Sequence, residues 1–81
     1  MPEQIIWSNT VDQGAFRVEV TRITDYKAKL VVTITNSGEP LLEDEITLSY
    51  AARFGPDVDD VDEWMSRTIK VVNEHLAKQG A

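Results

Sequence analysis

Two hydrophobic periodicities divide this chain of 81 residues. From residue 4 to residue 50, hydrophobic and polar side chains alternate over short segments, as in β-strands that bury one face. From residue 57 onward, hydrophobic residues recur every three or four positions, which is typical of an amphipathic helix. This order predicts one small α+β domain covering residues 1–81, with a sheet over about residues 4–52 and a helix over about residues 57–79.

Turn-forming residues divide the alternating region into four strands. The expected strands cover residues 4–9, 15–24, 27–36 and 42–50. Gly14, the pair Asp25-Tyr26 and the run from Asn36 to Pro40 supply the turns between them. Because these connections are short, we expect an antiparallel meander in the order 1-2-3-4. The loss of alternation at Ile23 predicts either a bulge near Thr21-Arg22 or a reversal of face at the strand end.

The core is predicted on one face of this sheet. The inward-facing set is Phe16, Val18, Val20, Ala28, Leu30, Val32, Ile34, Leu42, Ile46, Leu48 and Tyr50. A helical stripe within an arc of about 80° should cover this face. Its members are Val58, Val61, Met65, Ile69, Val72 and Leu76. Asp57 or Asp60 can cap the helix, and Asp60 with Glu63 has the spacing of a capping box.

A flank beside that stripe widens the apolar arc to about 160°. It consists of Trp64, Thr68, Val71 and His75. One interpretation is that the first strand or the loop around Phe54 covers this flank. The other is that it forms an exposed partner-binding surface anchored by Trp64, because tryptophan is enriched at interface centres.

The net charge of −6 is concentrated in one region. Residues 39–63 carry nine acids and Arg53, a balance of −9 + 1 = −8, whereas residues 1–38 balance to zero. The candidate acidic rim is Glu43, Asp44, Glu45, Asp57, Asp59, Asp60, Asp62 and Glu63. Such a surface repels nucleic-acid phosphates, so we expect no nucleic-acid partner. It either keeps the protein in solution or steers a protein partner.

No residue pattern indicates catalysis, a cofactor or a metal. His75 is the only histidine and there is no cysteine, which leaves few candidates for a nucleophile–base pair or a zinc site. The acidic run 57–63 lacks the alternating ligands and central glycine of a calcium-binding EF-hand loop. We therefore expect a protein that is not an enzyme and binds no cofactor.

The start of the chain has no basic segment leading into an apolar run, and apolar runs are short throughout. These features predict a cytoplasmic protein with no membrane partner. A domain this small has a thin core and gains stability when it associates. A homo-oligomer is therefore a further possible state of this protein.

Residues 48–64, with the sequence LSYAARFGPDVDDVDEW, resemble small accessory proteins encoded by actinobacterial tailed phages. The resemblance implies a protein made inside an infected bacterium that binds a host or phage protein. It carries no catalytic motif.

Together these features predict a small acidic protein–protein interaction module. Two alternatives remain open. One is an inhibitor that imitates nucleic acid and occupies a basic protein groove. The other is a self-assembling structural component, for example of a virion.

Overall fold

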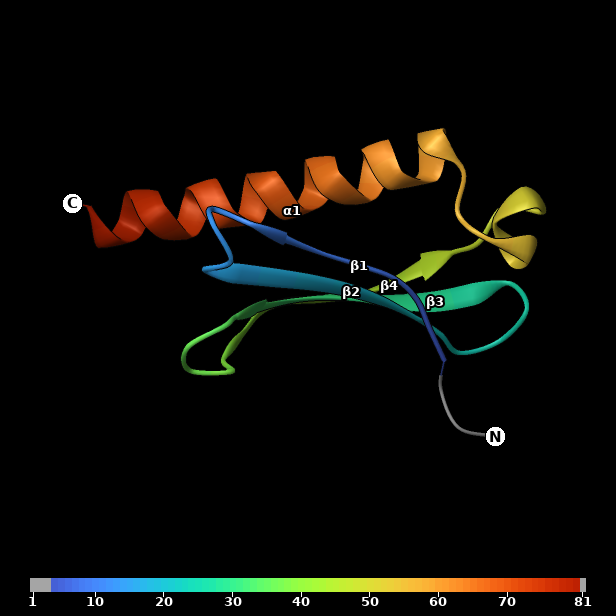
Figure 1. Ribbon diagram of the computed structural model, residues 1–81, viewed down its shortest axis with the longest axis horizontal. Helices are drawn as coiled ribbons and strands as arrows, with labels where there is room; N and C mark the ends of the chain where they lie inside the picture. Colours follow the sequence, from blue (N-terminus) through green and yellow to red (C-terminus); the bar gives the residue numbers. More distant parts are fainter. Residues whose placement is uncertain (1–3, 81) are drawn as a thin grey trace.

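The computed structural model describes residues 4–80 and confirms the predicted fold class and strand order. Its strands are β1 (Gln4–Val11), β2 (Phe16–Arg22), β3 (Lys27–Ile34) and β4 (Pro40–Thr47). They form one antiparallel sheet in the order β1-β2-β3-β4. A short 3₁₀ helix, η1 (Ala51–Phe54), leads into the long helix α1 (Val58–Gln79), which lies over one face of the sheet (Figure 1).

The last strand begins and ends earlier than the alternation predicts. β4 starts at Pro40 and ends at Thr47, so the chain leaves the sheet before Tyr50. The prediction that Tyr50 points into the core is therefore wrong, and its side chain is exposed. The sheet also has two register shifts. One lies between Ile5 and Trp7 of β1, opposite Thr21, so the extra residue is in β1 and not in β2 as one interpretation expected. The other lies between Val32 and Thr33 of β3, where β4 contributes the extra residue.

The core occupies the sheet face that the alternation predicts. Phe16, Val18, Leu30 and Val32 are buried, and Leu48 is buried just beyond the end of β4. These side chains point to one side because successive residues of a strand alternate between its faces. The opposite face carries the ion pairs Arg17–Glu19, Lys27–Glu45 and Lys29–Glu43.

The helix is rotated relative to the predicted stripe. Trp64, Thr68 and Val72 are its buried residues, whereas Val58, Ile69 and Leu76 of the predicted stripe are exposed. At 100° per residue, the buried face is centred about 60° from the predicted one. The rotation lets Trp64 reach Trp7 of β1, with 5.6 Å between the ring centroids.

Thr68 fits this buried face because its hydroxyl has a partner. Thr68 Oγ1 donates a hydrogen bond of 2.8 Å to the carbonyl oxygen of Trp64, one turn earlier in the helix. A buried hydroxyl without a partner would cost free energy, and this bond removes that cost. The other side of the residue is a methyl group, which suits a hydrophobic core.

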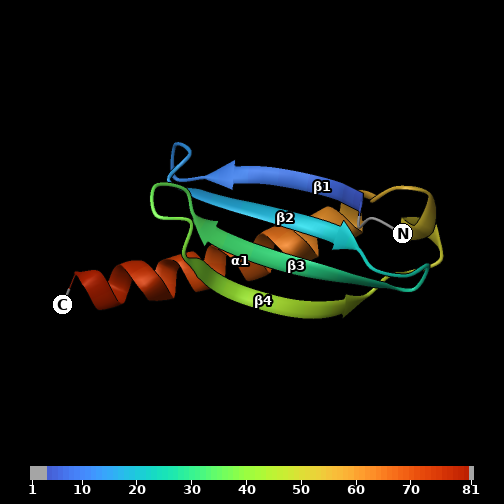
Figure 2. The same ribbon diagram turned by 90° about the horizontal axis from the view of Figure 1, so that it is seen from below.

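The helix begins with a capping box one turn earlier than the predicted pair. The amide of Asp60 donates to Asp57 Oδ1 at 2.9 Å, and the amide of Asp57 donates to Asp60 Oδ2 at 3.2 Å. Glu63 is not part of this box and lies near Arg67 instead. From this start, α1 crosses the sheet obliquely and its last turns extend past the end of the strands (Figure 2).

Candidate functional site

The structure divides the predicted acidic rim into two groups. Each acid of β4 has a basic partner: Glu43 lies 3.8 Å from Lys29, Glu45 lies 3.3 Å from Lys27, and Asp44 lies 2.7 Å from Arg67. Glu63 shares that arginine at 3.3 Å. All these groups are partly exposed, so each pair contributes little to stability, but together they neutralise this edge of the sheet.

The acids at the start of α1 are different. The carboxylates of Asp57 and Asp60 accept from each other's backbone amides, and Asp59 and Asp62 are exposed with no ion pair among the described residues. Within the described part of the chain, these four carboxylates in six residues therefore have no basic partner. They lie near the positive end of the helix dipole, which stabilises them there.

This local environment changes the titration of Asp60. Partial burial raises the pKa of the Asp60 carboxyl above its ordinary value of 3.8. The hydrogen bond from the Asp57 amide lowers this pKa, while the negative charges of Asp57 and Glu63 raise it further. The contributions of Asp57 and Glu63 to this raised pKa reflect the crowding of carboxylates at the start of α1.

Exposed hydrophobic side chains lie beside these acids. Tyr50, Phe54 and Val58 have the largest exposed fractions of any large hydrophobic residues in the described chain, at 73%, 78% and 75%. The rings of Tyr50 and Phe54 pack edge to face with their centroids 5.6 Å apart. We call this group, together with Asp57, Asp59, Asp60 and Asp62, the acidic tip. It lies at one end of the molecule, where the chain passes from β4 to α1 (Figure 1).

The local sequence explains this exposure. Gly55 has a φ of 136°, a conformation that side chains rarely adopt, and it separates η1 from the start of α1. Ala52 is buried and fixes η1 to the core, with its amide bonded to Ser49 Oγ at 3.2 Å. With Ala52 turned inward, the aromatic side chain of Phe54 lies on the outside.

The predicted helix flank is not an exposed surface. Trp64 is only 3% exposed and Thr68 is completely buried, so the expectation that this flank is exposed is wrong for both residues. Val71 and His75 are half-buried, and the His75 ring contacts Phe16 with its centroid at 5.9 Å. At Trp64 the other interpretation holds, because Trp7 of β1 packs against its ring.

The structure offers no cluster for metal chemistry in the part of the chain that it describes. Within residues 4–80, no group of three or more histidine and acidic side chains has the geometry to hold an ion. None of the helices in this range is both long and apolar enough to cross a bilayer.

Sequence reasoning missed the hydrophobic part of the acidic tip. Tyr50 was assigned to the core because it continued the alternation of the fourth strand, and Val58 because it continued the helical stripe. A signal was present in the sequence, since Gly55-Pro56 directly follows Phe54 and favours a break in regular structure.

No protein family model matches the chain, and no curated protein and no solved structure matches it.

Proposed function

We propose that this protein is a small non-enzymatic protein–protein interaction module that binds its partner through the acidic tip. The observation that carries this proposal is the concentration of the most exposed hydrophobic side chains beside carboxylates that have no basic partner among the described residues. Large aromatic residues are common anchors at the centres of interfaces, and unpaired charges around them choose the partner.

The partner's surface follows from this chemistry. Phe54 and Tyr50 require an apolar pocket in which they lose their contact with water. The surrounding carboxylates require lysine or arginine side chains at the rim of that pocket. The resemblance of residues 48–64 to accessory proteins of actinobacterial tailed phages supports a phage protein or a bacterial host protein as this partner.

Binding assays with variants of the tip test the proposal. A partner captured by the intact protein from bacterial lysate is purified and its affinity is measured at about 50 mM and about 500 mM salt, a range that strongly screens exposed charges. We expect Phe54→Ala to weaken binding by at least about tenfold. Changing Asp59 and Asp62 to asparagine should slow association and reduce its dependence on salt.

Leu76→Ala is the matched control, because Leu76 is also a partly exposed hydrophobic residue but lies near the other end of α1. It should leave the affinity of this partner unchanged. If Phe54→Ala and the two asparagine substitutions also leave the affinity unchanged, the tip is not the binding site and the proposal is wrong.

The nucleic-acid mimic is less well supported. Such an inhibitor needs an extended array of free carboxylates, whereas Glu43, Asp44 and Glu45 are paired with basic residues. It would lose its affinity steeply with salt and would be insensitive to Phe54→Ala. That combination of results would favour it over the proposed module.

A further inference from the structure

The two edges of the sheet differ in their protection against pairing with another strand. β4 begins with Pro40, which cannot donate a backbone hydrogen bond, and carries three consecutive acids. Proline and charged side chains are the usual devices that prevent edge strands from associating. β1 has neither, since Gln4–Val11 contains no proline and no charged residue. Two weaker features protect β1: the register shift between Ile5 and Trp7, which leaves Trp7–Val11 regular, and the Asn9 side chain, which accepts a hydrogen bond from the Thr10 amide.

The backbone groups of Ser8 and Thr10 lie on the outer side of β1, where a new strand must replace the Asn9 side chain as the partner of the Thr10 amide. The amide of Thr10 donates to the side chain of the adjacent Asn9 at 2.8 Å, which is consistent with this amide pointing away from β2. In an antiparallel strand, residues two apart direct their N–H and C=O groups to the same side, so Ser8 faces the same edge. Figure 2 shows β1 as the outermost strand on this side of the sheet.

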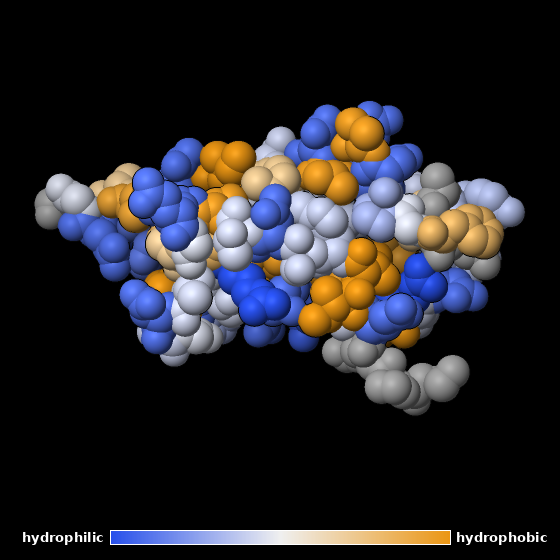
Figure 3. Space-filling view, in the orientation of Figure 1, coloured by the Kyte–Doolittle hydropathy of each residue, from blue (hydrophilic) through white to orange (hydrophobic). Residues whose placement is uncertain are grey.

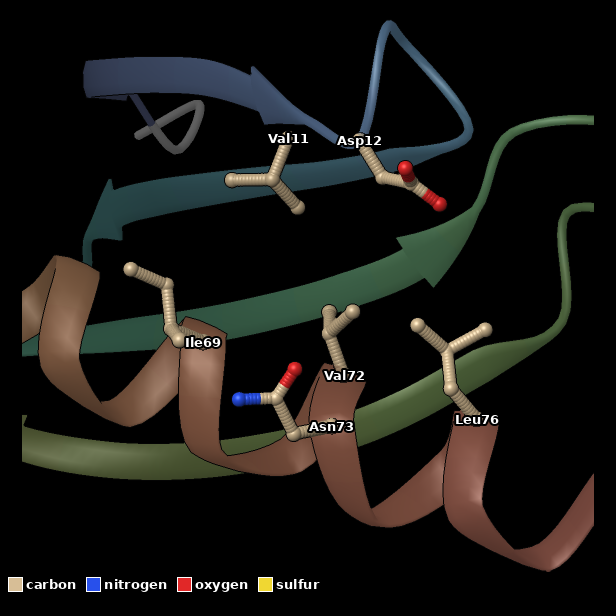
Figure 4. A pocket seen from close by; sticks show the side chains of 6 residues that line it. All are labelled: Val11, Asp12, Ile69, Val72, Asn73 and Leu76. Carbon is tan, nitrogen blue, oxygen red and sulfur yellow. The ribbon is translucent and has the colours of Figure 1, made fainter.

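Hydrophobic surface borders the same edge. A groove of about 400 Å³ runs between the end of β1 and α1, lined by Val11, Asp12, Ile69, Val72, Asn73 and Leu76 (Figure 4). Ile69 is 47% exposed there, although it is a large aliphatic residue. Figure 3, which views the molecule from the β1 side, shows hydrophobic residues along α1 and over β1.

We propose that a second copy of this chain pairs with β1 in antiparallel orientation, so that one sheet continues through both copies. The two-fold axis passes through Asn9. This register places Ser8 opposite Thr10 of the second copy and Trp7 opposite Val11 of the second copy. Both are combinations that stabilise neighbouring strands: a hydroxyl pair, and an aromatic residue beside a β-branched one.

The charge distribution favours a second copy at this edge. Each copy carries a net charge of −6, so most approaches of two copies are repulsive. Pairing through β4 would bring two sets of three acids together, whereas β1 adds no charge to the contact. The nearest acid, Asp12, lies opposite Ile6 of the second copy. The two Asp12 carboxylates are then roughly 20 Å apart. Because this distance exceeds the screening length of about 8 Å, their repulsion is weak.

In the same register, a side chain of the second copy covers part of the groove beside β1. Trp7 of the second copy lies next to Val11, at the border of the groove that contains Ile69. Val11 and the exposed side of Ile69 then lose contact with water. This gain of buried apolar surface adds to the backbone hydrogen bonds of the new strand pair.

Sedimentation equilibrium of the intact chain tests the proposal, together with two charge variants. Ser8→Lys with Thr10→Lys places lysines opposite lysines across the two-fold axis, and Ser8→Glu with Thr10→Glu places glutamates opposite glutamates. We expect the original chain to form dimers and each variant alone to dimerise at least about tenfold more weakly. A mixture of the two variants should form heterodimers, because each lysine then faces a glutamate.

Recovery in the mixture also shows that both variants fold, since unfolded chains could not restore the pairing. The matched control replaces Ser66 and Gln79 with lysine, which adds the same charge on exposed positions of α1 and should leave dimerisation unchanged. A monomeric original chain would overturn the proposal. So would a lysine variant that dimerises as strongly as the original, or a mixture without recovery.

This inference does not depend on the acidic tip. Phe54→Ala should remain dimeric while losing the partner, and the double lysine variant should become monomeric while keeping an intact tip. The two proposals therefore fail in different experiments.

Discussion

Two aromatic pairs in this protein have the same spacing and opposite surroundings. The rings of Trp7 and Trp64 lie 5.6 Å apart between β1 and α1, and those of Tyr50 and Phe54 lie 5.6 Å apart beside η1. Trp64 is buried, whereas Tyr50 and Phe54 are mostly exposed. The contact between two rings therefore does not reveal the role of a pair. What differs is whether the rest of the chain covers the pair, and this separates a pair in the core from a pair exposed to water.

The largest expected effect comes from truncating one aromatic residue of each pair and comparing the loss in free energy of unfolding. Trp64→Ala should lower the free energy of unfolding by about 3–5 kcal/mol, because it leaves a large cavity in a thin core. Phe54→Ala should change it by no more than about 0.5 kcal/mol, because its ring is already in water. Urea denaturation followed by circular dichroism measures both. Equal losses in the two variants would contradict the distinction between the pairs.

In the sequence, the capping box lies between the exposed pair and Trp64. Its removal tests how much the cap contributes to the stability of α1. Asp57→Ala removes the side-chain acceptor for the Asp60 amide and should lower the free energy of unfolding by about 1 kcal/mol. Asp59→Ala is the control, because Asp59 lies in the same turn without a capping bond, and it should cost about 0.3 kcal/mol through the helix dipole. If the two losses are the same, the box does not fix the start of α1.

The smallest expected effect is a change in the pKa of Asp60, beside the exposed pair. The pKa of Asp60 should be above 3.8 in a carboxyl NMR titration, and Asp57→Asn should lower it by removing a neighbouring negative charge. The folded protein then holds this proton more tightly than the unfolded chain. Stability from Asp60 is therefore present at low pH and lost as the pH rises through the raised pKa. An Asp60 pKa that does not respond to Asp57→Asn would exclude this cause.

The sequence was sufficient to predict the meander, its strand order and most of the core. The reason is that a period of two assigns each strand residue to one face, as it did for Val18, Leu30 and Val32. The orientation of α1 was not predictable in the same way. Its apolar arc is wide, so Ile69 and Trp64 were both plausible centres, and only contact with Trp7 selects the second.

The candidate site was predictable only in part. The acids of the tip follow from the charge distribution, but the neutralisation of Asp44 depends on Arg67, 23 residues later in the chain. Tyr50 was misassigned because alternation does not indicate where a strand leaves the sheet. Positions such as these depend on tertiary contacts that no local pattern contains.

Both tryptophans of the chain are found in a single pair that joins its first strand to its last helix. Intrinsic fluorescence is therefore a built-in optical reporter of one event, the docking of α1 against β1. A folding experiment that follows tryptophan emission would time this closure specifically, and it would be nearly blind to motions of the segment around Phe54.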